Sequence, residues 1–366
     1  MTRPLAVDLV GLVAAGPSGV PRYARSLSRA LDRVAAEFPD LSLRLIATPA
    51  IISAIDPRTI QARAVMPLNR RFDMGPVRLA VEQLAAATGR GLLHFFDLSG
   101  PVLAPRRPFT TTVHDAVVTR GYRGGLTFAY KRRLCPWAAR RARALVADTT
   151  FSRDEAVSRF GAPPRRVVVI PPGPGLMEVD GPPRMAMREA PFLLSVGNLV
   201  ENKNLPFLVR AFGRANVDAE LLLVGRPGSR VADLRRAIAA SPRANRIHVV
   251  TDATDADVDA LYRSARALLL PSRYEGFGFT PLEAMTRGCP VIASDIPAVR
   301  EVCGDGAWLL PPTDEPGWAR AIAEVAREDR LRARMIDRGS RVAGRYSWDA
   351  TARALCALFL RAGAGA

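Results

Sequence analysis

Lysine, histidine and cysteine are scarce in this chain of 366 residues. Only Lys131 and Lys203 of its 52 basic residues are lysines, and it has 3 histidines and 4 cysteines. The cysteines lie far apart without a CxxC pair, so the sequence has neither a zinc-ligand motif nor a disulfide framework. We attribute the excess of arginine to the base composition of the coding sequence, and we expect the cysteines to be buried thiols in a reducing compartment.

Long apolar runs are also missing. None reaches the roughly 18 residues of a membrane-spanning helix. Asp8 interrupts the first apolar run, so we expect neither a transmembrane segment nor a secretory leader. The composition, 48% hydrophobic and 24% charged, is typical of globular proteins and excludes disorder. The length is sufficient for two domains.

The net charge of +17 is concentrated in the first half of the chain. Residues 1–180 hold 26 basic and 14 acidic residues, a net charge of +12, whereas residues 181–366 hold 26 and 21, a net charge of +5. A basic surface attracts nucleic acid, anionic lipid or phosphorylated substrates. Nucleic acid is the least favoured of the three, because the sequence has no helix-turn-helix, RNA-recognition motif or alternation of aromatic and basic residues.

Short apolar runs alternate with helical patterns along the chain. They occupy 5–13, 43–49, 92–96, 109–115, 143–149 and 167–173 and, after a Pro/Gly-rich passage at 171–184, they occupy 191–197, 220–225, 247–252, 265–272, 290–295 and 307–312. Such alternation indicates parallel sheets covered on both faces, because a parallel crossover needs a helix-length return. We therefore predict the α/β class, with two Rossmann-like doubly wound domains at 1–184 and 185–345 that face a cleft, and a final helix at 346–366.

Ligands of open parallel sheets bind beyond the carboxyl ends of the strands, so the loops there are the candidate sites. After the first strand, Gly16 and Gly19 precede a helix whose terminal amides attract an anion. His114 and Asp115 end the strand at 109–115. This imidazole either donates to a sugar or phosphate oxygen or is satisfied by a backbone carbonyl, and the sequence leaves both alternatives open.

The helix after Gly19 has a stripe of arginines. Its apolar residues from Tyr23 to Phe38 share one face, and the opposite face carries Arg22, Arg25, Arg29 and Arg33. A solvated surface is the ordinary explanation for a charged face. Asp32 is the only acid among these arginines, however, which favours contact with an anionic membrane surface. A second basic cluster supports this interpretation: Lys131, Arg132, Arg133, Arg140, Arg141 and Arg143.

In the second half, the loop after the strand at 191–197 contains Gly197, Asn198 and Lys203. An ammonium near the start of a helix suits the two phosphates of a nucleotide diphosphate. The segment SRYEGFGFTPLEAMTRG at 272–288 carries the clearest motif. Its glycines allow exposed amides, and Pro281 is expected to begin a helix with a glutamate in its first turn. The nucleotide-sugar-binding candidates in this segment are Glu275, Gly276, Phe277, Gly278 and Glu283.

Over essentially its whole length the sequence resembles the retaining GT-B glycosyltransferases of family 4, which include many bacterial mannosyltransferases. The resemblance rests on the glycine loop at 16–19, HD at 114–115, NKN at 202–204 and, above all, the ExFGxxxxE motif from Glu275 to Glu283. It implies an acceptor-binding domain, then a nucleotide-sugar-binding domain, and a C-terminal helix that returns to the first.

The resemblance also implies roles for the motif residues. Glu275 is expected to contact the donor sugar, Glu283 the ribose and Lys203 the diphosphate. His114 and Asp115 are expected to act with Glu275 in catalysis. The implied mechanism is same-face attack with retention of configuration, and it needs no metal and no cofactor.

One feature departs from the family pattern. Many relatives have an arginine near the phosphate-binding lysine, where this chain has Asn198 and Asn202. Arg226 or Arg22 would then have to supply the second positive charge on the diphosphate.

These inferences predict a cytoplasmic glycosyltransferase that is peripherally associated with the inner face of the plasma membrane. It is expected to transfer a hexose, with mannose from GDP-mannose favoured, to a lipid-linked or polysaccharide acceptor of the cell envelope. The alternatives are a transferase that uses a UDP-sugar, and a GT-B phosphorylase or sugar-nucleotide epimerase. A non-enzymatic nucleic-acid binder is the least favoured class.

Overall fold

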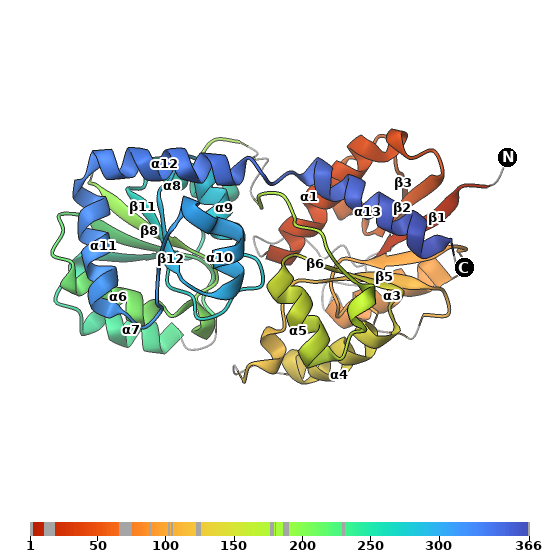
Figure 1. The fold of residues 1–366 in the computed structure, drawn as a ribbon, viewed down its shortest axis with the longest axis horizontal. Coiled ribbons are helices and arrows are strands. Elements are labelled where there is room, and N and C mark those ends of the chain that lie inside the picture. The colour runs from red at the N-terminus through yellow and green to blue at the C-terminus, as the bar shows by residue number, and fades with distance from the viewer. Residues whose placement is uncertain are drawn as a thin grey trace. The chain divides into compact units, whose positions relative to one another are not determined.

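The computed structural model describes residues 3–364 apart from 11–18, 66–74, 88, 102, 104, 122–125, 176–178, 180, 186–189 and 229–230. The chain forms two compact units (Figure 1). The first comprises Met1–Gly173 and Ser347–Ala366, and the second comprises Pro174–Tyr346. The sequence-based boundary at 184 is later than the structural one. The backbone N–H groups of Arg184 and Met185 already bind the carboxylate of Asp257 in the second unit.

The first unit contains a seven-stranded parallel sheet with the order β3-β2-β1-β4-β5-β6-β7. Its strands are β1 (Leu5–Val10), β2 (Leu41–Ala47), β3 (Gln61–Ala64), β4 (Leu92–Phe95), β5 (Phe109–Val113), β6 (Ala144–Ala147) and β7 (Val167–Val169). Its helices are α1 (Gly19–Val34), α2 (Pro49–Ile55), α3 (Gly75–Ala87), α4 (Leu126–Arg141), α5 (Thr150–Phe160) and α13 (Trp348–Gly363).

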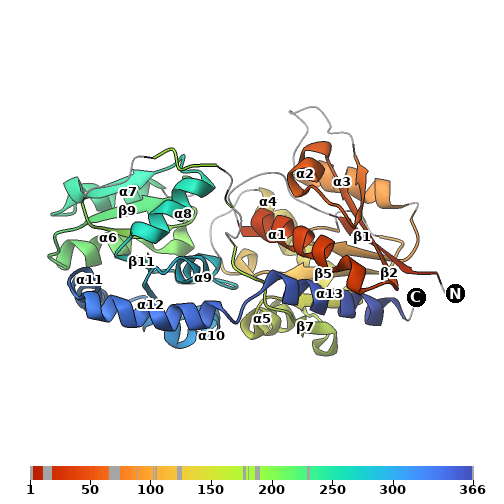
Figure 2. The same ribbon diagram turned by 90° about the horizontal axis from the view of Figure 1, so that it is seen from above.

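Helices from opposite ends of the chain pack together in this unit. Helix α1 buries Tyr23, Leu27 and Leu31, as its apolar periodicity predicts. Helix α13 lies along α1 (Figures 1 and 2) and also contacts β1 and β4. The rings of Tyr23 and Trp348 meet edge to face, with their centroids 5.5 Å apart. A separate core on the strands packs against α3, α4 and α5.

The second unit contains a six-stranded parallel sheet with the order β10-β9-β8-β11-β12-β13. Its strands are β8 (Phe192–Val196), β9 (Glu220–Val224), β10 (Ile247–Val250), β11 (Ala267–Leu270), β12 (Val291–Ser294) and β13 (Trp308–Leu310). Its helices are α6 (Leu205–Arg214), α7 (Val231–Ala239), α8 (Asp255–Ser264), α9 (Phe279–Thr286), α10 (Pro297–Cys303), α11 (Glu315–Arg327) and α12 (Asp329–Ala343).

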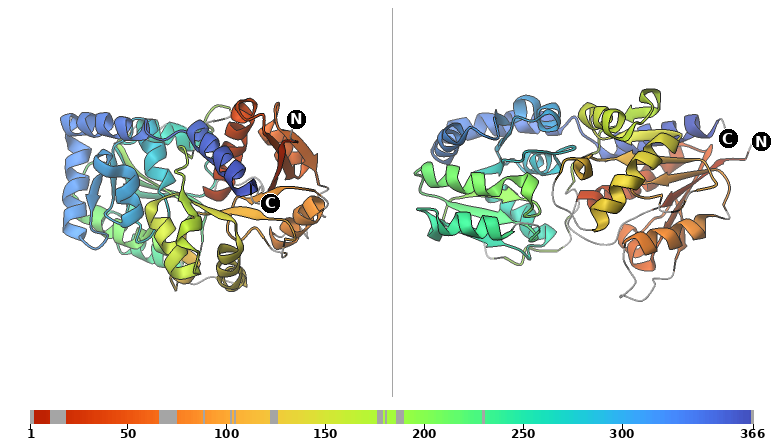
Figure 3. Two further views of the ribbon diagram at one scale, coloured as in Figure 1. Left: turned by 45° about the vertical axis from the view of Figure 1, so that its right-hand side comes forward. Right: turned by 90° about the horizontal axis from the view of Figure 1, so that it is seen from below.

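Alternate residues of the central strands in this unit enter two different cores. Leu222 and Leu268 belong to the core that α8, α9 and α10 cover, whereas Leu221 and Leu269 belong to the core around Trp318 under α6 and α11. Figures 2 and 3 show the helices on both faces of the sheet. The predicted fold class is therefore confirmed, and each predicted strand is present.

The sequence pattern does not predict β3. All of its residues, Gln61–Ala64, are exposed at the edge of the sheet, so the strand has no apolar run. It pairs with β2 through the backbone. All four cysteines are buried and free, and none of the helices that the structure describes is both long and apolar enough to cross a membrane.

Candidate functional site

The ends of two neighbouring parallel strands lie very close together next to the predicted lysine loop of the second unit. Gly197 follows β8 with φ of +143°, and Gly225 follows β9 with φ of +157°. A Cβ atom on Gly225 would collide with the carbonyl oxygen of Gly197, so this close approach requires glycine. The N–H of Leu199 donates to the carbonyl of Arg226 at 2.9 Å. Arg226 is exposed and forms no ion pair with any residue that the structure describes, so a free cation lies beside this loop.

Lys203 and Glu275 form an ion pair at the carboxyl edge of the second sheet. Lys203 ends the single 3-10 turn Glu201–Lys203 before α6, and Glu275 lies in the loop after β11. The Lys203 Nζ lies 2.5 Å from Oε1 of Glu275, and the side chains are 18% and 14% exposed. These residues are 72 positions apart in sequence. They meet because β8 and β11 are neighbours in the sheet.

Asn202 ties the two loops together. Its side-chain amide donates to the carbonyl of Tyr274 at 3.2 Å, and its own carbonyl accepts from the N–H of Arg273 at 2.8 Å. Asn198 is exposed beside it. The asparagine at 202 therefore positions the glutamate loop against the lysine loop, which gives a structural reason for one of the two departures from the family pattern.

Phe277 is a core residue. It is 3% exposed and packs against Phe279 and Tyr346, with ring centroids 4.9 and 5.8 Å apart. Gly276 is also buried, and Gly278 adopts φ of +108° as the residue that precedes α9. The ring therefore fills the interior of the second unit, and binding of a nucleotide sugar by Phe277, through its backbone amide as the resemblance implies, stays a prediction.

Glu283 is buried as well. Helix α9 begins at Phe279, ahead of Pro281, so Glu283 does not lie in its first turn as predicted. Its residue exposure is 1%, and its carboxylate accepts a hydrogen bond of 3.0 Å from the Tyr262 hydroxyl. A Cβ atom on Gly175 would collide with the carboxylate, so the backbone there covers it. Contact of Glu283 with ribose stays a prediction, and it requires the backbone at Gly175 to move.

In the first unit, His114 uses both ring nitrogens within the protein. Nδ1 lies 2.7 Å from Oδ2 of Asp148, and Nε2 lies 2.8 Å from the carbonyl oxygen of Phe96. A carbonyl only accepts, so Nε2 carries a proton, and the facing carboxylate favours a second proton on Nδ1. The structure thus shows the alternative in which a backbone carbonyl satisfies the imidazole. The catalytic role of His114 stays a prediction.

The protonated state of His114 has a consequence for stability. Burial lowers the pKa of His114, but the charge and hydrogen bond of Asp148, the charge of Asp97 and the Phe96 carbonyl outweigh it and raise this pKa to about 9 from 6.5. The folded protein therefore binds this proton more tightly than the unfolded chain. The resulting stability is fully present below pH 6.5 and is lost as the pH rises through 9.

We expect His114→Gln to remove this pH dependence. The free energy of unfolding of the wild-type protein should fall by on the order of 3 kcal/mol more than that of the variant between pH 6 and pH 10. Urea unfolding at four pH values in that window measures the difference. Parallel pH profiles for the two proteins would contradict the assignment of a buried imidazolium.

Three residues that the motifs do not identify belong to the same region of the first unit. Asp97 follows β4, Asp148 follows β6, and Lys131 of α4 lies 3.9 Å from Asp97. Each aspartate directly follows a buried strand region, as His114 and Asp115 do, so this position was the signal available in the sequence. Among the described residues, no three His, Cys, Asp or Glu side chains are grouped as metal ligands would be.

The proposed anion loop of the first unit is only partly described. Gly16 lies outside the described residues, and Gly19 is the exposed first residue of α1. Asp115 is exposed after β5, and its carboxylate accepts from the N–H of Val117 at 2.9 Å.

The arginines of α1 are not an unpaired stripe. Arg33 pairs with Asp349 of α13 at 2.7 Å, and Arg29 donates to the carbonyl of Ala54 at 2.7 Å. Arg22, Arg25 and Arg29 are half-buried. The local sequence offers few acidic partners for these arginines, but the fold supplies one for Arg33, because Asp349 comes from the other end of the chain. Contact with an anionic membrane stays a prediction.

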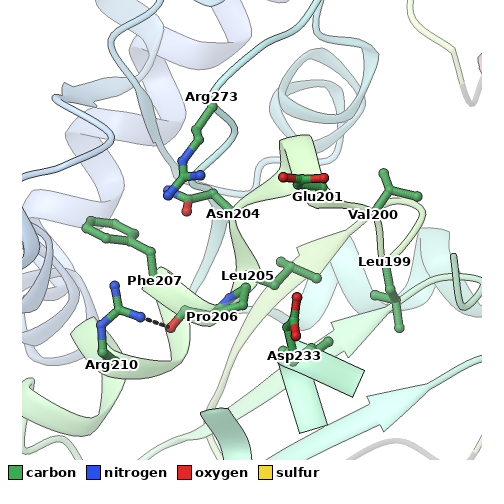
Figure 4. A pocket seen from close by; sticks show the side chains of 11 residues that line it. Leu199, Val200, Glu201, Asn204, Leu205, Pro206, Phe207, Arg210, Asp233 and Arg273 are labelled. Carbon is green, nitrogen blue, oxygen red and sulfur yellow. Dashed lines mark hydrogen bonds between the residues drawn. The ribbon is translucent and has the colours of Figure 1, made fainter. Parts of the chain in front are cut away.

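A cavity of about 250 Å³ lies beside the start of α6 (Figure 4). Leu199, Leu205 and Phe207 provide its apolar lining. Figure 4 shows Arg273 and Arg210 on one side and the carboxylates of Glu201 and Asp233 on the other. Lys203 and Glu275 do not line it, so this cavity is separate from the ion pair.

Two protein-family models match successive parts of the chain. The model described as Glycosyltransferase Family 4 matches residues 17–174, and the model described as Glycosyl transferases group 1 matches residues 186–342. Together they span most of both units.

Curated relatives match part of the chain. It is 32% identical over 250 residues to a D-inositol 3-phosphate glycosyltransferase of Kineococcus radiotolerans, a match that covers 60% of this chain and 57% of the relative. It is 28% identical over 222 residues to the O-antigen chain mannosyltransferase B of Escherichia coli, which covers 57% of this chain and 58% of the relative. The chain therefore matches less than two thirds of the length of these relatives.

Solved structures match the fold over nearly the whole chain. Sucrose-phosphate synthase from Thermosynechococcus elongatus has a TM-score of 0.72 at 20% identity and covers 100% of both chains. Anabaena HepE in complex with UDP and glucose has a TM-score of 0.72 at 16% identity, with 98% of this chain and 100% of that chain covered. With the family models over both units, the chain belongs to the GT-B glycosyltransferases that combine a family 4 domain with a group 1 domain.

Proposed function

We propose that this glycosyltransferase moves a hexose from a nucleoside diphosphate sugar to a lipid-linked or polysaccharide acceptor with retention of configuration, and that GDP-mannose is its donor. The pair of Lys203 and Glu275 carries the proposal. The two groups, 2.5 Å apart, form an ion pair with one another. A donor offers both of them a new partner, because its diphosphate attracts the ammonium and its sugar hydroxyls donate to the carboxylate.

The charge that develops on the leaving group explains why a lysine is needed. As the glycosidic bond breaks, negative charge accumulates on the nucleoside diphosphate, and an ammonium held beside it stabilises the transition state more than the ground state. Exposed Arg226 lies beside the same loop and supplies the second charge in this proposal. A phosphate oxygen of the leaving group takes the acceptor proton, so the proposed reaction needs neither a metal nor a cofactor.

The relatives support different parts of this proposal. The Escherichia coli protein is named as a mannosyltransferase of the O-antigen chain, which favours mannose and a polysaccharide acceptor. The Kineococcus radiotolerans protein is named for an inositol phosphate. The Anabaena structure contains UDP, so a UDP-sugar is the second candidate donor.

A donor screen by mass spectrometry tests the proposal. The protein is incubated with GDP-mannose, UDP-glucose and UDP-N-acetylglucosamine, and both the nucleotide and the sugar product are weighed. We expect GDP release with mannose transfer, which Glu275→Gln abolishes and Glu324→Gln, a change at an exposed glutamate of α11, leaves intact.

Two results would contradict the proposal. One is that no donor is transferred or hydrolysed while Glu275→Gln alters activity on another substrate. The other is a sugar phosphate or an epimerised nucleotide sugar as the product, which would indicate a phosphorylase or an epimerase.

A further inference from the structure

The chain has two lysines, one in each unit. Each lies beside a carboxylate near the carboxyl edge of the sheet of its own unit. Lys203 pairs with Glu275 in the second unit, and Lys131 faces Asp97 in the first. The other 50 basic residues are arginines, including those that hold the buried carboxylate of Asp8 in the interior. In a chain that uses arginine almost everywhere, the two remaining lysines mark places where an ammonium has an advantage over a guanidinium.

The pair of Lys131 and Asp97 is open, unlike the structural ion pairs. Lys131 Nζ lies 3.9 Å from Asp97 Oδ1, which exceeds hydrogen-bond distance, and the side chains are 32% and 21% exposed. No residue that the structure describes forms a hydrogen bond with this ammonium. By contrast, Arg44 binds both oxygens of Asp8, at 2.7 and 2.9 Å.

Asp97 has one anchored oxygen and one available oxygen. Its Oδ1 accepts from the N–H of Ser99 at 2.7 Å and from the Ser99 hydroxyl. Within the described part of the chain, nothing donates to its Oδ2. An ammonium with free donors therefore lies beside a fixed carboxylate with a free acceptor. Vicinal hydroxyl groups fit such a combination, because each hydroxyl both donates and accepts.

Two further groups, the Tyr130 hydroxyl and the Asp115 carboxylate, interact electrostatically with this pair. The hydroxyl of Tyr130 is buried without a hydrogen-bond partner among the described residues, and the charges of Asp97 and Lys131 both act on it. The charge of Asp97 is the main reason that the pKa of Lys131 is raised, and Asp115 adds to the effect. His114 is occupied by Asp148. The charges of two carboxylates, Asp97 and Asp115, thus act on one ammonium, a balance that disfavours a phosphate.

We propose that Lys131 and Asp97 bind vicinal hydroxyl groups of an uncharged polyol, a sugar or a cyclitol, as part of the acceptor. This inference rests on the proposed glycosyltransferase function and deepens it. Lysine is required because a guanidinium would occupy both oxygens of Asp97, as Arg44 does at Asp8, and would leave no acceptor for a hydroxyl.

The experiment uses the whole protein and three probes. Methyl α-D-mannopyranoside and myo-inositol are uncharged, and inositol 3-phosphate is the charged comparison. Saturation-transfer NMR measures the affinity of each probe, and calorimetry measures the affinity for GDP and UDP. The variants are Lys131→Arg, Lys131→Met and Asp97→Asn. The matched control is Arg153→Lys, at an exposed pair with Asp154.

We expect the uncharged probes to bind at least about tenfold more weakly to Lys131→Arg, whose guanidinium would occupy both oxygens of Asp97, and to Asp97→Asn, which removes the charged acceptor. Arg153→Lys should bind them like the wild type, and nucleotide affinity should be unchanged in every variant. Thermal unfolding checks the fold, and Lys131→Met keeps the test valid if the arginine variant is misfolded, because it removes the donors without blocking Asp97.

Three outcomes would overturn the inference: uncharged probes that do not bind the wild type, uncharged probes that bind the folded Lys131 variants unchanged, or tighter binding of inositol 3-phosphate that depends on Lys131. The last would indicate an anion site. Failure of the proposed function is a different result, namely a protein that binds the polyols through Lys131 but neither binds nor turns over any nucleotide or nucleotide sugar.

Discussion

Replacing Lys203 by methionine is expected to lower kcat/KM for the nucleotide sugar by roughly 10²–10³-fold, the usual cost of losing one charge-stabilising group at a transition state. Methionine has a similar length and no charge. The effect should appear mainly in kcat, because the charge on the leaving diphosphate is largest after the glycosidic bond has begun to break. Steady-state kinetics with the donor identified by the mass screen measure it.

Part of the expected loss of kcat/KM arises because Lys203→Met leaves Glu275 without its partner. The two side chains lie 2.5 Å apart, and the carboxylate is only 14% exposed. A double-mutant cycle with Glu275→Gln separates the two contributions. We expect the double variant to regain thermal stability relative to Lys203→Met, because no unpaired carboxylate remains, and to stay inactive. Lys203→Arg is the charge-conserving comparison. Near wild-type kcat/KM in Lys203→Met would exclude the proposed role of the ammonium.

The fold was largely predictable from the sequence because both sheets are buried on two faces. Strands such as β4 and β9 are almost entirely apolar, so their runs stand out against the helical patterns. Strand β3 was not predictable, because an exposed edge strand needs only backbone pairing with its neighbour. The burial of Asp8 inside β1 also follows from tertiary contacts, since its partners Arg44 and Arg107 come from later segments.

The candidate site was predictable in position and less so in orientation. The rule that ligands bind at the carboxyl ends of parallel strands placed Lys203 and Glu275 at one edge, and sheet order brought them together. Side-chain direction depends on packing that a motif does not contain. For that reason Phe277 and Glu283, which share the motif with Glu275, turned out to be buried. The partner of Arg33 was likewise hidden, because Asp349 is far away in sequence.

Replacing Asp8 by alanine is expected to destabilise the first unit by roughly 3–5 kcal/mol, the range for removing one partner from a buried ion pair. Asp8 is 1% exposed in β1. Arg44 binds both of its oxygens, and Arg107, whose side chain is 9% exposed, adds a contact at 2.5 Å. The alanine variant would leave two guanidinium groups without their shared carboxylate. Urea unfolding monitored separately for the two units measures the change.

The matched comparison is Glu37→Ala, which removes a carboxylate from a solvent-exposed pair in the same unit. Arg353 binds Glu37 at 2.7 Å, but the side chains are 50% and 46% exposed, so water replaces the lost partner and the unfolding midpoint should barely move. Equal effects of Asp8→Ala and Glu37→Ala would mean that water reaches Arg44 and Arg107 once the carboxylate is gone. A loss of stability confined to the first unit would show instead that the burial of Arg107 depends on Asp8 as its counter-ion. Carbonyl groups, such as that of Ala86 at 2.7 Å, accept hydrogen bonds from the guanidinium but cannot neutralise its charge.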